Sequence, residues 1–254
     1  MESISLEGLF GGLPFLDRSF RTDKFLTAVA CARRHRHART GASALDLTRY
    51  LQPTVALKVA GARIPGNPPS SGHAAQVEGA LSQLVARRPI WRPLLQLPVV
   101  LRTHDSPKVL GYSSAARPQH FVLGPRAFTD EEELREQVLH EVAHIWLYMV
   151  QELWPLHHPT AQDTFVLPSG VGGKSATGVL DAAFVAAVLR QYYSHNRGRL
   201  ERTAFLGRYM DECLVALRSA ALTHFGLEVA SRLRKVTALR RGTSRSGSYA
   251  HRPN

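Results

Sequence analysis

A single long helix, predicted over residues 129–150, is the feature that most constrains this 254-residue chain. Thr129 and, three residues later, Glu132 form the pattern of a capping box, and the acidic run over residues 130–133 suits the positive end of a helix dipole. Apolar residues then recur at the helical period: Leu134, Val138, Val142, Ile145, Trp146 and Met149. The segment is therefore predicted to be one capped, amphipathic helix.

This helix carries the sequence His140-Glu141-Val142-Ala143-His144. Positions four residues apart share a face of a helix, so His140 and His144 point the same way and can hold one metal ion from one side. Glu141 lies beside them, where it can reach the water at the metal or a bound substrate. Two half-buried histidines on an amphipathic helix would give the same pattern, but the capped helix and its register favour a metal site.

Two histidines need at least one further ligand. The extended pattern with a third histidine on the next turns is absent, because Leu147 and Val150 occupy its positions. The carboxylates between His144 and residue 200 are Glu152, Asp163 and Asp181. Glu152 points too far along the helix axis and Asp163 falls in a loop, which leaves Asp181 as the favoured ligand.

Asp181 belongs to an otherwise apolar helix, GVLDAAFVAAVL, that can pack against the motif helix. The alternative explanation is that its carboxylate complements the N-terminus of that helix. Other histidines remain as rival ligands: His157, His158 and His195. Two histidines and one carboxylate suit Fe(II) with open coordination positions, and they also suit zinc with a water in the fourth place.

The net charge of +12 is unevenly distributed. Residues 21–102 carry +10 and residues 230–254 carry +7, whereas residues 103–229, which hold the motif, carry −3. Basic flanks attract polyanions such as an acidic peptide, an acidic carrier protein or nucleic acid. Nucleic acid is disfavoured because the basic segments lack interleaved aromatic residues. Abundant arginine from a GC-rich coding sequence is the alternative explanation.

The composition predicts a cytoplasmic protein. No apolar run approaches the ~20 residues that a membrane span needs, and the N-terminus has no basic segment typical of a signal peptide. Cys31 and Cys213 are distant from each other and suggest reduced thiols.

The fold class is predicted to be α+β and mostly α-helical, with a small sheet preceding the motif helix. Helices are expected over 17–39, 43–60, 75–88, 178–194, 200–225 and 227–239, and short strands over 97–101, 108–112 and 120–123. Residues 155–177 are expected to form a flexible loop. We expect one domain over residues 1–240, with a possible internal boundary near 63–72, and a disordered basic tail over 241–254.

The stretch from about residue 119 to 230 resembles the HExxH-type peptide β-hydroxylases found beside ribosomal-peptide modification clusters. The likeness is carried by the HEVAH segment, by Trp154-Pro155, by a glycine-containing loop and by the helix start G-V-L-x-A-A-F at 178–184. In that family the third metal ligand is expected in this helix start as a histidine, where the present chain has Asp181. The loop carries Lys174-Ser175 where Arg-Pro is expected.

The resemblance implies a dioxygenase that uses Fe(II) and 2-oxoglutarate to hydroxylate a side-chain carbon of a peptide or carrier-bound amino acid in natural-product biosynthesis. His140, His144 and Asp181 would hold the iron, and Glu141, the candidate catalytic residue, would fix a water or a ligand. Lys174 and Arg218 are candidates for the cation that binds the far carboxylate of 2-oxoglutarate. The basic flanks would bind an acidic leader peptide or carrier protein.

Two other classes remain open. In a zinc peptidase or other hydrolase, Glu141 would be the general base, and Tyr192, Tyr193 or His195 could stabilise the oxyanion. A non-catalytic DNA-binding or partner-binding protein with a relic site would use the basic N-terminal segment and the tail.

Overall fold

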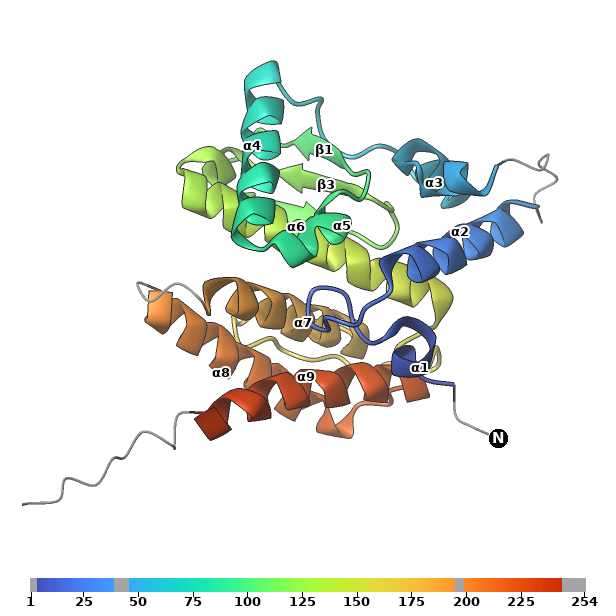
Figure 1. Cartoon of the computed structure of the whole chain (residues 1–254), viewed down its shortest axis with the longest axis vertical. Helices are drawn as coiled ribbons and strands as arrows, with labels where there is room; N and C mark the ends of the chain where they lie inside the picture. Colours follow the sequence, from blue (N-terminus) through green and yellow to red (C-terminus); the bar gives the residue numbers. More distant parts are fainter. Residues whose placement is uncertain (1–3, 39–45, 195–198, 244–254) are drawn as a thin grey trace, which may run out of the picture. The chain divides into compact units, whose positions relative to one another are not determined.

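The computed structural model describes residues 4–38, 46–194 and 199–243, and over 237–243 it defines only the helical backbone (Figure 1). The described residues confirm the α+β class: they are mostly helical, with a small sheet before the motif helix. By its internal contacts the chain divides into two compact units, Met1–Pro155 and Leu156–Asn254. The stretch at 63–72, expected as an internal boundary, lies inside the first unit.

The first unit contains every predicted strand and the motif helix. In chain order its elements are α1 (Leu6–Phe10), α2 (Thr22–Ala38), η1 (Leu47–Leu51), α3 (Pro53–Val59), α4 (Ser71–Arg87), η2 (Pro89–Trp91), α5 (Arg92–Leu95), β1 (Val100–Thr103), β2 (Gly111–Ser113), β3 (His120–Leu123), η3 (Pro125–Phe128) and α6 (Glu131–Leu153). The helix expected over 43–60 is divided in two, because Pro53 starts α3 at the position where its missing N–H costs nothing.

The sheet has the strand order β1-β3-β2, with β3 parallel to β1 and antiparallel to β2. All four residues of β3, His-Phe-Val-Leu, are buried, as a strand covered on both faces requires. β1 and β2 each begin three residues later than expected. Pro98 has no N–H to give to a strand ladder, so β1 starts only at Val100.

The helix α6 packs against β2, β3 and α4 (Figure 1). Its N-cap is Asp130, whose carboxylate accepts a 2.8 Å hydrogen bond from the Glu133 N–H. The prediction of Thr129 as the cap was wrong by one residue. The turn η3 immediately precedes α6, and the Thr129 hydroxyl donates back to the Arg126 carbonyl of that turn at 2.9 Å.

The basic run at the end of α2, over residues 33–37, is not a fully solvated face. Arg33 is only 1% exposed, whereas Arg34, His35 and Arg36 are exposed. The Arg33 guanidinium pairs with Glu152 in the last turn of α6, and it also donates to the Tyr50 carbonyl at 2.9 Å. A buried cation of this kind is tolerated because its donors are met by a carboxylate and a carbonyl.

The second unit is built from α7 (Ala176–Tyr193), α8 (Leu200–Ala216), η5 (Leu217–Ser219) and α9 (His224–Thr243), with α7 in contact with both α8 and α9. Most positions of α7 are buried around its whole circumference, which agrees with its uninterrupted apolar sequence. The helix expected over 200–225 ends early. The chain leaves it so that residues 221–223 can hydrogen-bond with residues 156–158.

The loop over 155–177 contains a narrow antiparallel turn. Phe165 and Lys174 exchange backbone hydrogen bonds of 2.8 and 3.1 Å, and the Leu167 N–H donates to the Val171 carbonyl at 2.8 Å. Gly170 and Gly173 have φ of 84° and 70°, which a side chain would strain.

At the C-terminus, residues 241–243 continue α9 rather than starting a tail, and the rest of the predicted tail lies outside the described residues. Across the helices that the structure describes, none combines the length and the apolar character that a membrane span requires.

Candidate metal centre

A partly exposed stripe runs along the otherwise buried middle of α6, residues 134–150. His140, His144 and Tyr148 are partly accessible, whereas the residues between them, 141–143 and 145–147, are buried. The spacing of four residues puts these three side chains on one side of the helix. The predicted shared face of the two histidines is therefore present, and a tyrosine extends it by one turn.

The two imidazoles approach each other through their Nε2 atoms, which are 3.2 Å apart. The ring centroids are 4.9 Å apart and the rings are inclined by 65°. Two nitrogens at this separation, each about 2.05 Å from one ion, subtend about 100° at that ion, between the octahedral and tetrahedral values. The pair therefore fits a metal ion. Without metal, the same distance suits a hydrogen bond between the rings.

Glu141 borders this stripe and is buried against the sheet. It is 2% exposed, and its Oε1 would be 3.1 Å from a Cβ atom added to Gly111 of β2. Among the described residues, its Oε2 has no hydrogen-bond partner. Burial, the larger effect, raises the pKa of Glu141 from 4.5 to about 7, and the neighbouring Ser113 hydroxyl acts in the lowering direction although the two groups lack full hydrogen-bond geometry.

Asp181 lies in the second unit, in the second turn of α7, and is 8% exposed. The alternative explanation for Asp181 was that its carboxylate complements the N-terminus of this helix. The N-cap is instead Ser175, whose hydroxyl accepts a 3.3 Å hydrogen bond from the Gly178 N–H. Capping therefore does not account for this buried carboxylate, and its role as a metal ligand stays a prediction.

The two candidate cations for 2-oxoglutarate also belong to the second unit, and both are exposed. Lys174 immediately precedes the N-cap of α7, and Arg218 lies in η5. Their role stays a prediction as well.

The rival histidine ligands have different surroundings. His157 is half-buried, and its Nδ1 lies 2.5 Å from the Thr177 hydroxyl in the first turn of α7. His158 is exposed, and His195 lies outside the described residues. Within the described ranges, no three His, Cys, Asp or Glu side chains are gathered as a metal-holding group. The described residues thus present two facing histidines without a third ligand gathered beside them.

Sequence reasoning missed three residues around this pair: Gly111, Ser113 and Tyr148. Tyr148 repeats the four-residue spacing of the histidines, and this signal could have been used. Gly111 and Ser113 come from a strand 28 or more residues upstream of Glu141, and nothing in their local sequence marks them as neighbours of the motif.

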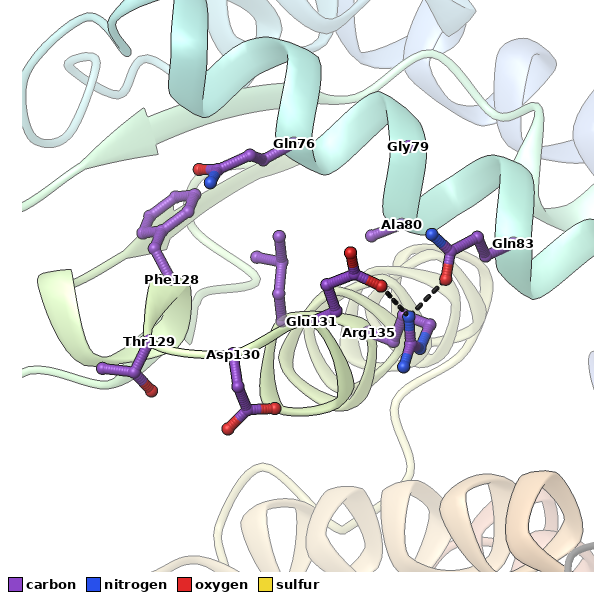
Figure 2. A pocket seen from close by; sticks show the side chains of 10 residues that line it. Gln76, Gly79, Ala80, Gln83, Phe128, Thr129, Asp130, Glu131 and Arg135 are labelled. Atoms are coloured by element: carbon purple, nitrogen blue, oxygen red, sulfur yellow. Dashed lines mark hydrogen bonds and ion pairs between the residues drawn. The ribbon is translucent and has the colours of Figure 1, made fainter.

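A pocket of about 300 Å³ lies at the other end of α6, between its first turns and α4 (Figure 2). Arg135, which is 6% exposed, donates there to Glu131 at 3.1 Å, to Glu132 at 2.8 Å and to Gln83. The lining comprises Gln76, Gly79, Ala80, Gln83, Phe128, Thr129, Asp130, Glu131, Leu134 and Arg135. The guanidinium is balanced by the helix's own carboxylates, which makes this feature a structural junction and separates it from the histidine pair.

Two comparisons with known proteins found nothing similar to this chain. No protein-family model matches it, and no curated protein is significantly similar to it.

Proposed function

We propose that this chain is a mononuclear non-haem iron enzyme that uses 2-oxoglutarate and O2 to hydroxylate a side-chain carbon of a peptide or carrier-bound amino acid. The proposal rests on the difference in accessibility between the two histidines and Glu141 on α6. Its accessible stripe offers two chelating imidazoles, while its only motif carboxylate, Glu141, is buried against β2. This arrangement suits chemistry in which the metal and its cosubstrate, rather than a protein base, act on the substrate.

The donor set supports iron. Neutral imidazole nitrogens on adjacent coordination positions, completed by one carboxylate, leave the remaining positions open. His140 and His144 would supply the nitrogens, and Asp181 would supply the carboxylate oxygen. When bound, Fe(II) and 2-oxoglutarate supply the activation of O2 and the two electrons, from oxidative decarboxylation, that a C–H hydroxylation requires.

Binding of 2-oxoglutarate and of the substrate-bearing partner would depend on charged groups. The far carboxylate of 2-oxoglutarate needs a cation, for which Lys174 and Arg218 are the candidates, and their exposure leaves both able to reorient. The net charge of +12 favours an acidic peptide or carrier protein as the substrate-bearing partner.

A zinc hydrolase is the second candidate, favoured by Glu141 itself. A carboxylate beside a chelating pair of histidines, with one oxygen unpartnered among the described residues, is suited to take a proton from an attacking water. It ranks second because a general base must reach that water, and this side chain is only 2% exposed.

The test is an anaerobic titration of the Fe(II)-loaded protein with 2-oxoglutarate, followed by visible absorption. A charge-transfer band that grows and saturates is expected, because the cosubstrate would chelate an iron with open positions. His140→Ala should abolish the band and Glu141→Gln should retain it. Absence of the band, with tightly retained zinc and hydrolysis lost in Glu141→Gln, would replace the proposal by the hydrolase. A band that persists in His140→Ala would overturn the assigned site.

A further inference from the structure

Some backbone N–H and C=O groups of the edge strand β2 point away from its neighbour β3. It is the last strand in the order β1-β3-β2. The Gly124 N–H donates to the Leu110 carbonyl at 2.9 Å, so this pair is hydrogen-bonded, and antiparallel pairs alternate between bonded and non-bonded. Ser113, opposite Phe121, is therefore in a non-bonded pair, and its carbonyl points away from β3.

The side chain of Tyr148 reaches this outward-pointing carbonyl of Ser113. Its hydroxyl donates to the Ser113 oxygen at 3.5 Å, which is long for a hydrogen bond. Long side chains on a helix lean toward its N-terminus, so the Tyr148 ring covers the turn that carries His144. The two rings are nearly parallel, inclined by 15°, with centroids 5.7 Å apart. This distance is within the range of offset aromatic stacking.

A continuous set of contacts thus leads from the sheet to the histidine pair. The Tyr148 hydroxyl approaches the Ser113 carbonyl, the ring of Tyr148 lies nearly parallel to the ring of His144 and offset from it, and Nε2 of His144 faces Nε2 of His140 at 3.2 Å. An imidazole on a helix can rotate about two side-chain bonds, and only some orientations aim Nε2 at a shared ion. A flat neighbour restricts that rotation before any metal binds.

We infer that Tyr148 is a positioning residue of the metal centre, which holds the imidazole of His144 in its chelating orientation. The inference rests on the proposed function, because it requires that the histidine pair binds a metal. The stack supplies most of the restraint and the hydroxyl supplies little, since the hydrogen bond is long. Residues that orient a metal ligand typically change metal affinity by 10–100-fold when they are removed.

The experiment is a Co(II) titration of the full chain against a competing chelator, with the visible ligand-field bands recorded. Tyr148→Leu removes the flat ring, and Tyr148→Phe removes only the hydroxyl. Tyr112→Leu is the matched control: Gly111 and Ser113 lie on the Glu141 side of β2, so alternation places Tyr112, also half-exposed, on the other face. The melting temperature of each metal-free variant is measured alongside.

We expect Tyr148→Leu to bind Co(II) 10–100-fold more weakly than the wild type and to change the bands, because His144 is no longer held. Tyr148→Phe should bind within about threefold of the wild type, because a long neutral hydrogen bond contributes little. Tyr112→Leu should bind like the wild type even if its melting temperature falls.

Wild-type affinity and bands in Tyr148→Leu would overturn the role of Tyr148. Equal weakening in Tyr112→Leu would also overturn it, because the loss would then reflect general destabilisation. If the wild type itself shows no Co(II) binding that depends on His140, the proposed metal centre fails, and the role of Tyr148 fails with it.

Discussion

Arg33 and Glu152 form a two-point ion pair that joins the end of α2 to the end of α6. The Nε of Arg33 lies 2.9 Å from Oε2 of Glu152, and Nη2 of the same guanidinium lies 2.6 Å from Oε1. The Arg33 side chain is 1% exposed and that of Glu152 is 12% exposed. The pair fixes the last turn of the helix that carries both histidines.

Breaking this pair should strongly destabilise the protein. Glu152→Gln leaves a buried guanidinium without its counter-charge, and such losses typically cost about 3–5 kcal/mol. Arg36 also reaches Glu152, but its side chain is 46% exposed, so Arg36→Ala should cost less than about 1 kcal/mol. Urea unfolding of the metal-free protein measures both. Equal effects of the two variants would contradict a special role for the buried pair.

The buried carboxyl of Glu141 should make the stability of the metal-free protein depend on pH. Its pKa is raised from 4.5 to about 7, so the folded state holds a proton that the unfolded state has lost between these values. The protonated carboxyl of Glu141 makes its full contribution to the free energy of unfolding below pH 4.5. About 3 kcal/mol of this free energy is lost as the pH rises toward 7. Chelator-treated wild type and Glu141→Gln should be compared by denaturant unfolding across this range. The free energy of unfolding of the wild type should fall relative to that of Glu141→Gln as the pH rises. A difference that stays constant with pH would exclude the raised pKa of Glu141.

The two cysteines should differ sharply in reactivity. Cys31 is exposed, whereas Cys213 is buried in α8, and its burial raises the pKa of its thiol to about 12. Only the thiolate reacts quickly, so iodoacetamide at neutral pH should add one group, at Cys31, and a second only after unfolding. Mass spectrometry counts the additions, and Cys31→Ser should give none in the folded protein. Rapid labelling of native Cys213 would show that this part of α8 opens.

Asp181 should be required for metal binding and product formation but not for folding. Its helix is capped by Ser175, so Asp181→Ala removes no cap and should leave the circular dichroism spectrum unchanged. Fe(II) affinity should fall at least tenfold, and hydroxylation of a peptide substrate should disappear, because a ligand has been lost. Asp163→Ala, in the loop before α7, is the control and should behave like the wild type. Hydroxylation that survives in Asp181→Ala would remove this residue from the ligand set.

Local patterns in the sequence were sufficient for the secondary structure near the motif. The helical period and the acidic first turn predicted α6, and the four-residue spacing predicted that His140 and His144 share a side of it. Boundaries were less accurate because they depend on neighbours. The cap moved from Thr129 to Asp130 once η3 formed, and α8 ended early because residues 221–223 pair with residues 156–158.

The sequence by itself determined the motif helix, the shared side of the two histidines and the mostly helical class, because each follows from periodicity within one segment. Only the tertiary structure decided what surrounds the motif. It buried Glu141 against Gly111, brought Tyr148 to the outward carbonyl of Ser113, and made Arg33 the buried partner of Glu152. Each of these depends on contacts between residues far apart in the chain, which the packing of α6 on the sheet and on α2 creates and which local sequence does not encode.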